Sequence, residues 1–143
     1  MRPDAPDTAP LEAAARRIRL HAYAPYSGYQ VGAALSAEDG RTFVGVNVES
    51  ASYPLTTCAE RGAVMAAVAA GARRFSAIAV ATASSPPAAP CGGCRQVLRE
   101  FGPDLLVVAV NDAGERRSWR LGELLPEAFA PDTVGQDLPR GAT

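Results

Sequence analysis

Two short runs dominate the middle of the chain: T-C-A-E-R-G-A at residues 57–63 and P-C-G-G-C-R-Q-V-L-R-E-F at residues 90–101. They contain all the cysteines of the protein, Cys58, Cys91 and Cys94. Three thiolates form an incomplete tetrahedron around Zn²⁺, and catalytic zinc sites differ from structural ones by keeping one position open. Glu60 adds a carboxylate beside the first cysteine, an arrangement typical of metal-assisted hydrolysis. The pattern therefore predicts a catalytic zinc centre.

Parts of this pattern also fit a redox pair, a closed structural zinc site or buried cysteines without a metal. A lone C-x-x-C pair is typical of a thioredoxin-like redox site, but a redox pair needs neither a third cysteine nor a nearby glutamate. A closed structural site would require the only histidine, His21, which lies far upstream of Cys58 at the expected exposed end of a helix. Unligated cysteines would pack as small hydrophobic residues, yet their clustering in two paired motifs favours a shared metal.

Composition limits the function classes. The chain has 143 residues, 48% of them hydrophobic and 20% charged, so it is sized for one globular domain. We expect that domain to span residues 1–130, followed by a flexible tail at residues 131–143 that is rich in Pro, Gly and Asp. A net charge of −1 argues against a nucleic-acid partner. The absence of a long apolar run argues against a membrane span.

The expected location is the cytoplasm. The first residues, M-R-P-D-A-P-D-T, lack the apolar core of a secretory signal. Three cysteines cannot all pair within one chain, and thiolate ligands require a reducing compartment.

Hydrophobic periodicity predicts the secondary structure. A first helix begins at Pro10, carries an apolar stripe to Ala22 and ends at Pro25. Further helices are expected at residues 59–72, 93–101 and 121–125, and strands at residues 31–37, 42–48, 78–82, 105–110 and 118–120. The helix at residues 59–72 is apolar nearly all round, which predicts burial against a sheet. This order predicts a three-layer α/β/α sandwich with a mixed five-stranded sheet.

The same pattern places polar groups around the cysteines. Both cysteine motifs open helices, whose N-termini favour thiolate over thiol. Three thiolates give the zinc site a formal charge of −1, which Arg61 or Arg95 can offset by hydrogen bonding to sulfur; Arg61 is the better placed. Asn47 and Glu49 share one face of an extended segment just before the first motif, as surface groups or as substrate contacts.

The chain resembles the small homotetrameric zinc-dependent cytidine deaminases from about residue 23 to residue 129. The motifs that carry the resemblance include A-Y-A-P-Y-S, V-G-A-A-L, N-V-E, A-S-Y-P-L, C-A-E-R, P-C-G-G-C-R-Q-V-L-R-E-F and E-L-L-P-E-A-F. Deaminases that act on polynucleotides usually begin the zinc motif with H-x-E. Cys58 stands in that place here, as it does in enzymes for free nucleosides.

The resemblance implies a role for each matching position. Cys58, Cys91 and Cys94 would bind zinc, and Glu60 would move protons. Asn47 and Glu49 would hydrogen-bond the ribose, the backbone around Ala59 would contact the base edge, and Tyr29 would lie beside the base. Tyr53 and Phe129 would reach a neighbouring subunit's site. Three departures from the family pattern border the presumed pocket: Tyr29 and Gln30 where it usually reads Phe-Pro, and Ser50 where Asn is common.

The expected activity is hydrolytic deamination of cytidine and 2′-deoxycytidine to uridine and 2′-deoxyuridine, a pyrimidine salvage reaction with a small nucleoside as the partner. Two alternatives stay open. One is a deaminase of another small aminopyrimidine nucleoside, such as a nucleoside antibiotic. The other is a zinc-bearing binding domain without turnover.

Overall fold

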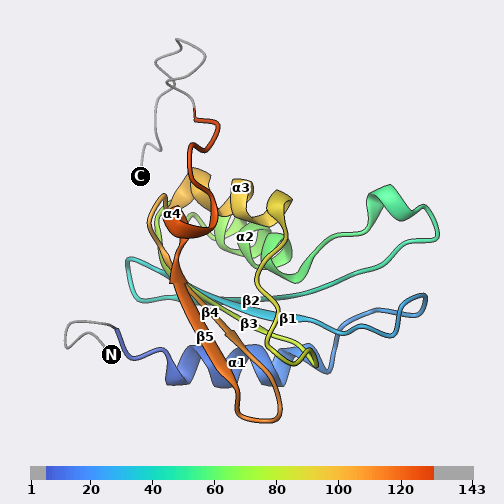
Figure 1. Ribbon diagram of the computed structural model, residues 1–143. Helices are drawn as coiled ribbons and strands as arrows, with labels where there is room; N and C mark the ends of the chain where they lie inside the picture. The colour runs from blue at the N-terminus through green and yellow to red at the C-terminus, as the bar shows by residue number, and fades with distance from the viewer. Residues whose placement is uncertain (1–5, 131–143) are drawn as a thin grey trace.

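A five-stranded mixed sheet organises residues 6–130, the part of the chain that the computed structural model describes (Figure 1). The elements in chain order are α1 (Ala9–Arg19), β1 (Gly32–Ala37), β2 (Thr42–Val46), the 3-10 helix η1 (Tyr53–Leu55), α2 (Ala59–Ala69), β3 (Phe75–Ala81), α3 (Gly92–Phe101), β4 (Leu106–Val110), β5 (Arg116–Arg120) and α4 (Leu121–Leu124). The strand order is β2-β1-β3-β4-β5, and only the β3–β4 pair is parallel. The predicted mixed sheet is confirmed.

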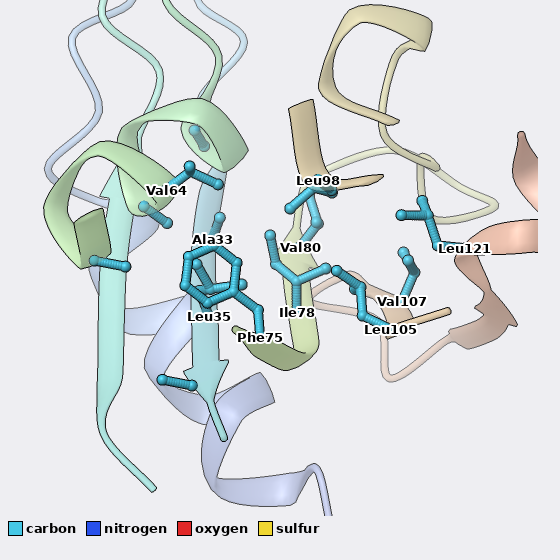
Figure 2. Close-up of a cluster of buried hydrophobic side chains, with 14 of the residues drawn as sticks. Ala33, Leu35, Val64, Phe75, Ile78, Val80, Leu98, Leu105, Val107 and Leu121 are labelled. Carbon is cyan, nitrogen blue, oxygen red and sulfur yellow. The ribbon is translucent and has the colours of Figure 1, made fainter. Parts of the chain in front are cut away.

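Helices cover both faces of the sheet. In Figure 1, α1 lies below the sheet, and α2, α3 and α4 lie above it. The alternation along β1 matches this division: Ala33 and Leu35 pack in the larger core on the α2 side, whereas Ala34 packs in the smaller core with α1. Figure 2 shows the larger core, where Val64 of α2 and Leu98 of α3 meet side chains of the sheet. The predicted α/β/α sandwich is therefore confirmed.

Two glycines let helices lie directly on the strand backbone. A Cβ atom at Gly45 of β2 would come within 2.3 Å of the amide nitrogen of Ala63 and 2.4 Å of the carbonyl oxygen of Ala59, both in α2. A Cβ atom at Gly32 of β1 would lie 2.2 Å from the carbonyl oxygen of Ala15 in α1. No side chain fits at either contact, so these glycines fix the height of both helices above the sheet.

The first two helices end earlier than predicted. Helix α1 stops at Arg19, because the amides of His21 and Ala22 bond to carbonyls three residues back and turn the chain. The last member of the predicted stripe, Ala22, is therefore outside the helix. Helix α2 ends at Ala69, where Gly71 takes a left-handed conformation with φ +92° and closes the C-terminus.

Strand boundaries also differ from the sequence prediction. Strand β3 begins at Phe75 rather than at residue 78, and β5 begins at Arg116 rather than at residue 118. Both extra segments pair with a neighbouring strand, which gives them order that local sequence does not encode. Strand β2 ends at Val46, and Val48 makes only isolated bridges beyond it.

The prediction that α2 is buried holds for one face only. Ala59, Ala63 and Ala67 are fully buried, but Met65 on the opposite side is 60% exposed in the single chain. None of the helices among residues 6–130 is long and apolar enough to cross a membrane. The predicted tail at residues 131–143 lies outside the described residues.

Candidate metal and active site

The fold brings the three cysteines together at two helix N-termini. Cys58 is the N-cap of α2, Cys91 is the N-cap of α3, and Cys94 lies in the first turn of α3. Their sulfur atoms all lie within 4.8 Å of one another, and the sulfurs of Cys58 and Cys91 are 4.0 Å apart. Tetrahedral zinc with Zn–S bonds of about 2.3 Å requires sulfurs about 3.8 Å apart. The cluster therefore fits a zinc ion with little movement.

The thiols have opposite tendencies to ionise. A hydrogen bond with Cys94, together with the neighbouring Arg61 guanidinium, lowers the pKa of Cys58 to about 5 in spite of its partial burial. The same hydrogen bond and burial raise the pKa of Cys94 above its ordinary value. Ionisation of Cys58 therefore favours the neutral thiol form of Cys94. Only a bound cation would favour ionisation of all three sulfurs at once.

Glu60 lies beside this cluster as the second residue of α2. The residue is only 5% exposed. Burial, and secondarily the negative charge of Cys58, raise the pKa of its carboxyl group. A buried carboxyl group with a raised pKa beside a possible metal site is a candidate for general acid–base catalysis.

The two arginines near the cysteines have different contacts. Nη2 of Arg61 lies 3.4 Å from the sulfur of Cys58, the contact that the sequence predicted as charge compensation. Its buried Nε has no hydrogen-bond partner among the described residues. Arg95 instead donates to the carbonyl oxygens of Pro90 and Leu124, each at 2.8 Å. The structure therefore supports Arg61 as the sulfur partner, whereas Arg95 ties α3 to α4.

Asn47 and Glu49 both face the loop that precedes β1. Asn47 is buried, and its side chain accepts from the amide of Val31 at 2.9 Å and donates to the carbonyl of Tyr29 at 2.7 Å. Glu49 accepts from the amides of Tyr26 at 2.9 Å and Ser27 at 3.1 Å, and from the Ser27 hydroxyl. These hydrogen bonds lower the pKa of Glu49, the Ser27 hydroxyl contributing most. Both side chains lie on the same side of the extended segment, as predicted. In the single chain their hydrogen bonds are to the loop before β1.

The aromatic candidates lie at the surface of the single chain. Tyr29 is 39% exposed and its hydroxyl lies 2.5 Å from that of Ser84. Tyr53 of η1 is 72% exposed and meets Tyr26 edge to face at 6.1 Å between ring centroids. Phe129 is 64% exposed, and its carbonyl accepts from Gln96 of α3 at 2.8 Å. Ala59 is fully buried at the first position of α2, where backbone amides have no partner within the helix.

This region also contains two serines that sequence reasoning did not single out. Ser27 bridges Glu49 and the amide of Tyr29, and Ser84 meets the Tyr29 hydroxyl. Both lie in polar loops whose composition resembles any surface loop, so no local signal marked them.

Three thiols and a buried carboxyl group at the ends of two helices, on an α/β/α sandwich, define a metal-binding domain of the hydrolytic type. A family model of the cytidine and deoxycytidylate deaminase zinc-binding region matches residues 9–110. The chain belongs to this zinc-binding deaminase family.

Relatives and solved structures agree with that assignment. A cytidine deaminase of Sporosarcina psychrophila is 42% identical over 129 residues, which cover 90% of this chain and 95% of the relative. A cytidine deaminase of Halalkalibacterium halodurans is 45% identical over 119 residues, covering 82% of this chain and 90% of the relative. The crystal structure of cytidine deaminase from Burkholderia pseudomallei matches with a TM-score of 0.81 and 53% identity, covering 84% of this chain and 97% of that one.

Proposed function

We propose that the protein catalyses the hydrolytic deamination of cytidine and 2′-deoxycytidine to uridine and 2′-deoxyuridine, with release of ammonia, as a step of pyrimidine salvage. The observation that carries this proposal is the cluster of three cysteine sulfurs within 4.8 Å beside the buried Glu60. Three protein ligands leave a fourth zinc position open. Relatives of similar length named cytidine deaminase support the choice of substrate.

Cys58, Cys91 and Cys94 would hold the zinc ion. When bound, zinc supplies the Lewis acidity that brings the pKa of water toward neutrality. Glu60 would take a proton from the attacking water, whose oxygen bonds to C4 of the cytosine ring, and pass that proton to N3. Glu60 would then take the second proton from the new hydroxyl group on C4 and give it to the amino group, whose bond to C4 breaks to release ammonia as the C4 carbonyl forms. One carboxyl group can perform every transfer provided that it lies within hydrogen-bond reach of both water and base.

Arg61 would balance the charge of the site. Three thiolates on a dication leave one net negative charge, which weakens the pull of the metal on water. The guanidinium 3.4 Å from the Cys58 sulfur withdraws electron density from that ligand by hydrogen bonding.

Asn47 and Glu49 would bind the ribose, with Tyr29 and the backbone around Ala59 against the base. The Asn47 side chain already fixes the loop at Tyr29 and Val31, so it would position this edge of the pocket as well as contact the sugar. Glu49 shares its oxygens with Ser27, and a sugar hydroxyl would compete for the same acceptors.

The active unit would be a homotetramer in a reducing compartment, the cytoplasm. Support for assembly comes from apolar side chains that the single chain leaves exposed, Tyr53, Leu55, Met65 and Phe129. In this proposal Tyr53 and Phe129 complete the site of a neighbouring subunit. Support for the reducing compartment comes from the proposed role of the cysteines, because thiolate ligands have to stay reduced to bind zinc.

A substrate panel tests the proposed function. Purified protein of known zinc content is mixed with cytidine, 2′-deoxycytidine or cytosine, and deamination is followed by ultraviolet absorbance and ammonia release. We expect turnover of both nucleosides and little turnover of free cytosine, because the base lacks the ribose. Zinc-loaded protein without ammonia release would indicate a non-catalytic binding domain.

One observation favours a variant of this function. The hydroxyl of Tyr29, where the family pattern usually has Phe, is hydrogen-bonded at the edge of the proposed pocket. A modified aminopyrimidine nucleoside, such as a nucleoside antibiotic, therefore belongs in the same panel. Faster turnover of such a compound than of cytidine would reassign the substrate.

A further inference from the structure

We propose that the hydroxyl pair of Tyr29 and Ser84 is a positioning contact that joins the loop before β1 to the loop leading to Cys91. This inference rests on the proposed function. It assigns the pair a task in nucleoside binding, although neither hydroxyl takes part in the chemistry.

The pair stands where two adjacent strands leave the sheet. Strands β1 and β3 are antiparallel, and their ladder ends where Gly32 pairs with Ala81. Tyr29 lies three residues before Gly32, and Ser84 lies three residues after Ala81, so the two chains part at the same end of the sheet. Their hydroxyl oxygens meet at 2.5 Å. The contact thus extends the connection between the strands beyond the last backbone pair.

Tyr29 belongs to the loop that the proposed sugar-binding residues hold. Its carbonyl accepts from Asn47 at 2.7 Å, and its amide donates to the Ser27 hydroxyl at 3.0 Å. The Ser27 hydroxyl in turn donates to Glu49. The backbone of Tyr29 is therefore fixed on one side of the proposed pocket, and its hydroxyl fixes the far end of the ring.

Ser84 belongs to a loop that is anchored independently. Its carbonyl accepts from the side chain of Asn111 at 3.0 Å. Asn111 is buried and also binds Glu115, which accepts from the Ser85 hydroxyl at 2.5 Å. The loop continues to Cys91 at the N-terminus of α3. Ser84 is thus a firm anchor, and a firm anchor can restrict the motion of the exposed Tyr29 ring.

This arrangement predicts an effect on binding rather than on chemistry. Tyr29→Phe removes only the hydroxyl, and Ser84→Ala removes its partner. Each should raise the KM for cytidine about two- to tenfold, the effect of one neutral hydrogen bond. The kcat and the zinc content should stay close to those of the wild type, because Glu60 and the cysteines are untouched.

A double-mutant cycle tests whether the two hydroxyls act together. The KM of the combined variant Tyr29→Phe/Ser84→Ala should be no higher than that of the more impaired single variant. Ser76→Ala is the matched control, because its hydroxyl donates to the carbonyl of Ser36 at the other end of the β1–β3 ladder. Its effect should multiply with that of Tyr29→Phe. Singles with unchanged KM, or a Tyr29/Ser84 pair whose effects multiply, would overturn the proposal.

Hydrogen exchange gives a readout that does not depend on turnover. Amides at residues 26–31 and the non-proline amides at residues 84–89 should exchange faster in both Tyr29→Phe and Ser84→Ala, and to a similar extent. Faster exchange confined to the mutated loop would contradict a contact that joins the loops. If the wild type fails to deaminate any nucleoside, the proposed function fails, and hydrogen exchange still decides whether the contact exists.

Discussion

Cys58 and Cys94 show how a single residue depends on its neighbours at this site. The hydrogen bond between them lowers one pKa and raises the other, so the cluster without metal holds a mixture of thiolate and thiol. Cys91 is the exposed member of the three. Its side chain contributes little to the core, which makes it the best position for separating metal binding from folding.

Each of the three cysteines should be needed for one shared zinc ion. Cys91→Ser should fold, because the side chain is exposed, but lose most of its zinc. Cys58→Ala should lose zinc as well. Metal analysis per chain, with circular dichroism as the folding control, checks both variants. Full zinc in Cys58→Ala together with none in Cys91→Ser would contradict a shared site.

Glu60→Gln should separate metal binding from proton transfer. The amide has nearly the same shape as the carboxyl group, so fold and zinc content should be retained. The kcat for cytidine should fall at least about 10²–10⁴-fold, because the amide cannot accept and return protons. Steady-state kinetics on zinc-matched samples provide the measurement, and near-normal turnover would remove Glu60 from the mechanism.

Substitutions at Asn47 and at Glu49 should differ in their effect on the stability of the fold. Asn47→Ala leaves the Val31 amide and the Tyr29 carbonyl without partners, so we expect destabilisation of about 1–3 kcal/mol and a lower kcat/KM. Glu49→Gln, at a more exposed position, should lower kcat/KM with little change in stability. Urea unfolding and cytidine kinetics distinguish the two. An unchanged kcat/KM in both variants would leave these residues with a loop-holding task only.

At the scale of elements, the sequence predicted the type and order of the helices and strands better than their first and last residues. Helices opened by Cys58 and Cys91 were predictable because the motifs and the apolar periodicity agree locally. The ends of α1 and β3 were not, because they depend on hydrogen bonds to the turn after Arg19 and to neighbouring strands. The contact of Tyr29 with Ser84, 55 residues apart, likewise requires the fold. The zinc cluster was predictable because a rare residue type marked it.

The close approach of α2 to β2 should make Gly45 intolerant of any side chain. Gly45→Val would push against the backbone of Ala59 and Ala63, which cannot rotate away. We expect destabilisation of about 1–3 kcal/mol or more, as for an overpacked core. Gly122→Ala in α4 is the control, because its Cβ would make only an ordinary contact at 3.6 Å. Equal unfolding midpoints for the two variants would contradict a rigid helix–strand contact.

At the scale of the whole molecule, the single chain leaves a set of apolar side chains without cover. Met65 on α2, Leu55 in η1 and Phe129 after α4 are each at least 60% exposed. These side chains come from three different parts of the chain, and the proposed assembly would cover them. The sequence predicted small side chains on α2, but the exposed position of Met65 emerges only from the fold.

The proposed tetramer should be measurable through Phe129. Phe129→Ala removes an exposed ring, so zinc content and the fold of each chain should be retained. Its kcat/KM for cytidine should fall by about tenfold or more, because the ring is proposed to exclude water from a neighbour's site. A chain that ends at Leu125 should show the same loss. Light scattering gives the oligomeric state, and a fully active monomer would end the proposal.

The exposed Tyr53 also has a consequence for how the protein behaves on dilution. If its ring completes a neighbour's site, activity becomes a property of the assembly and follows mass action. Activity per milligram should then fall as the sample is diluted below the dissociation constant and return when it is concentrated again. An enzyme built in this way would work at full rate only where its own concentration is high enough to keep its subunits together.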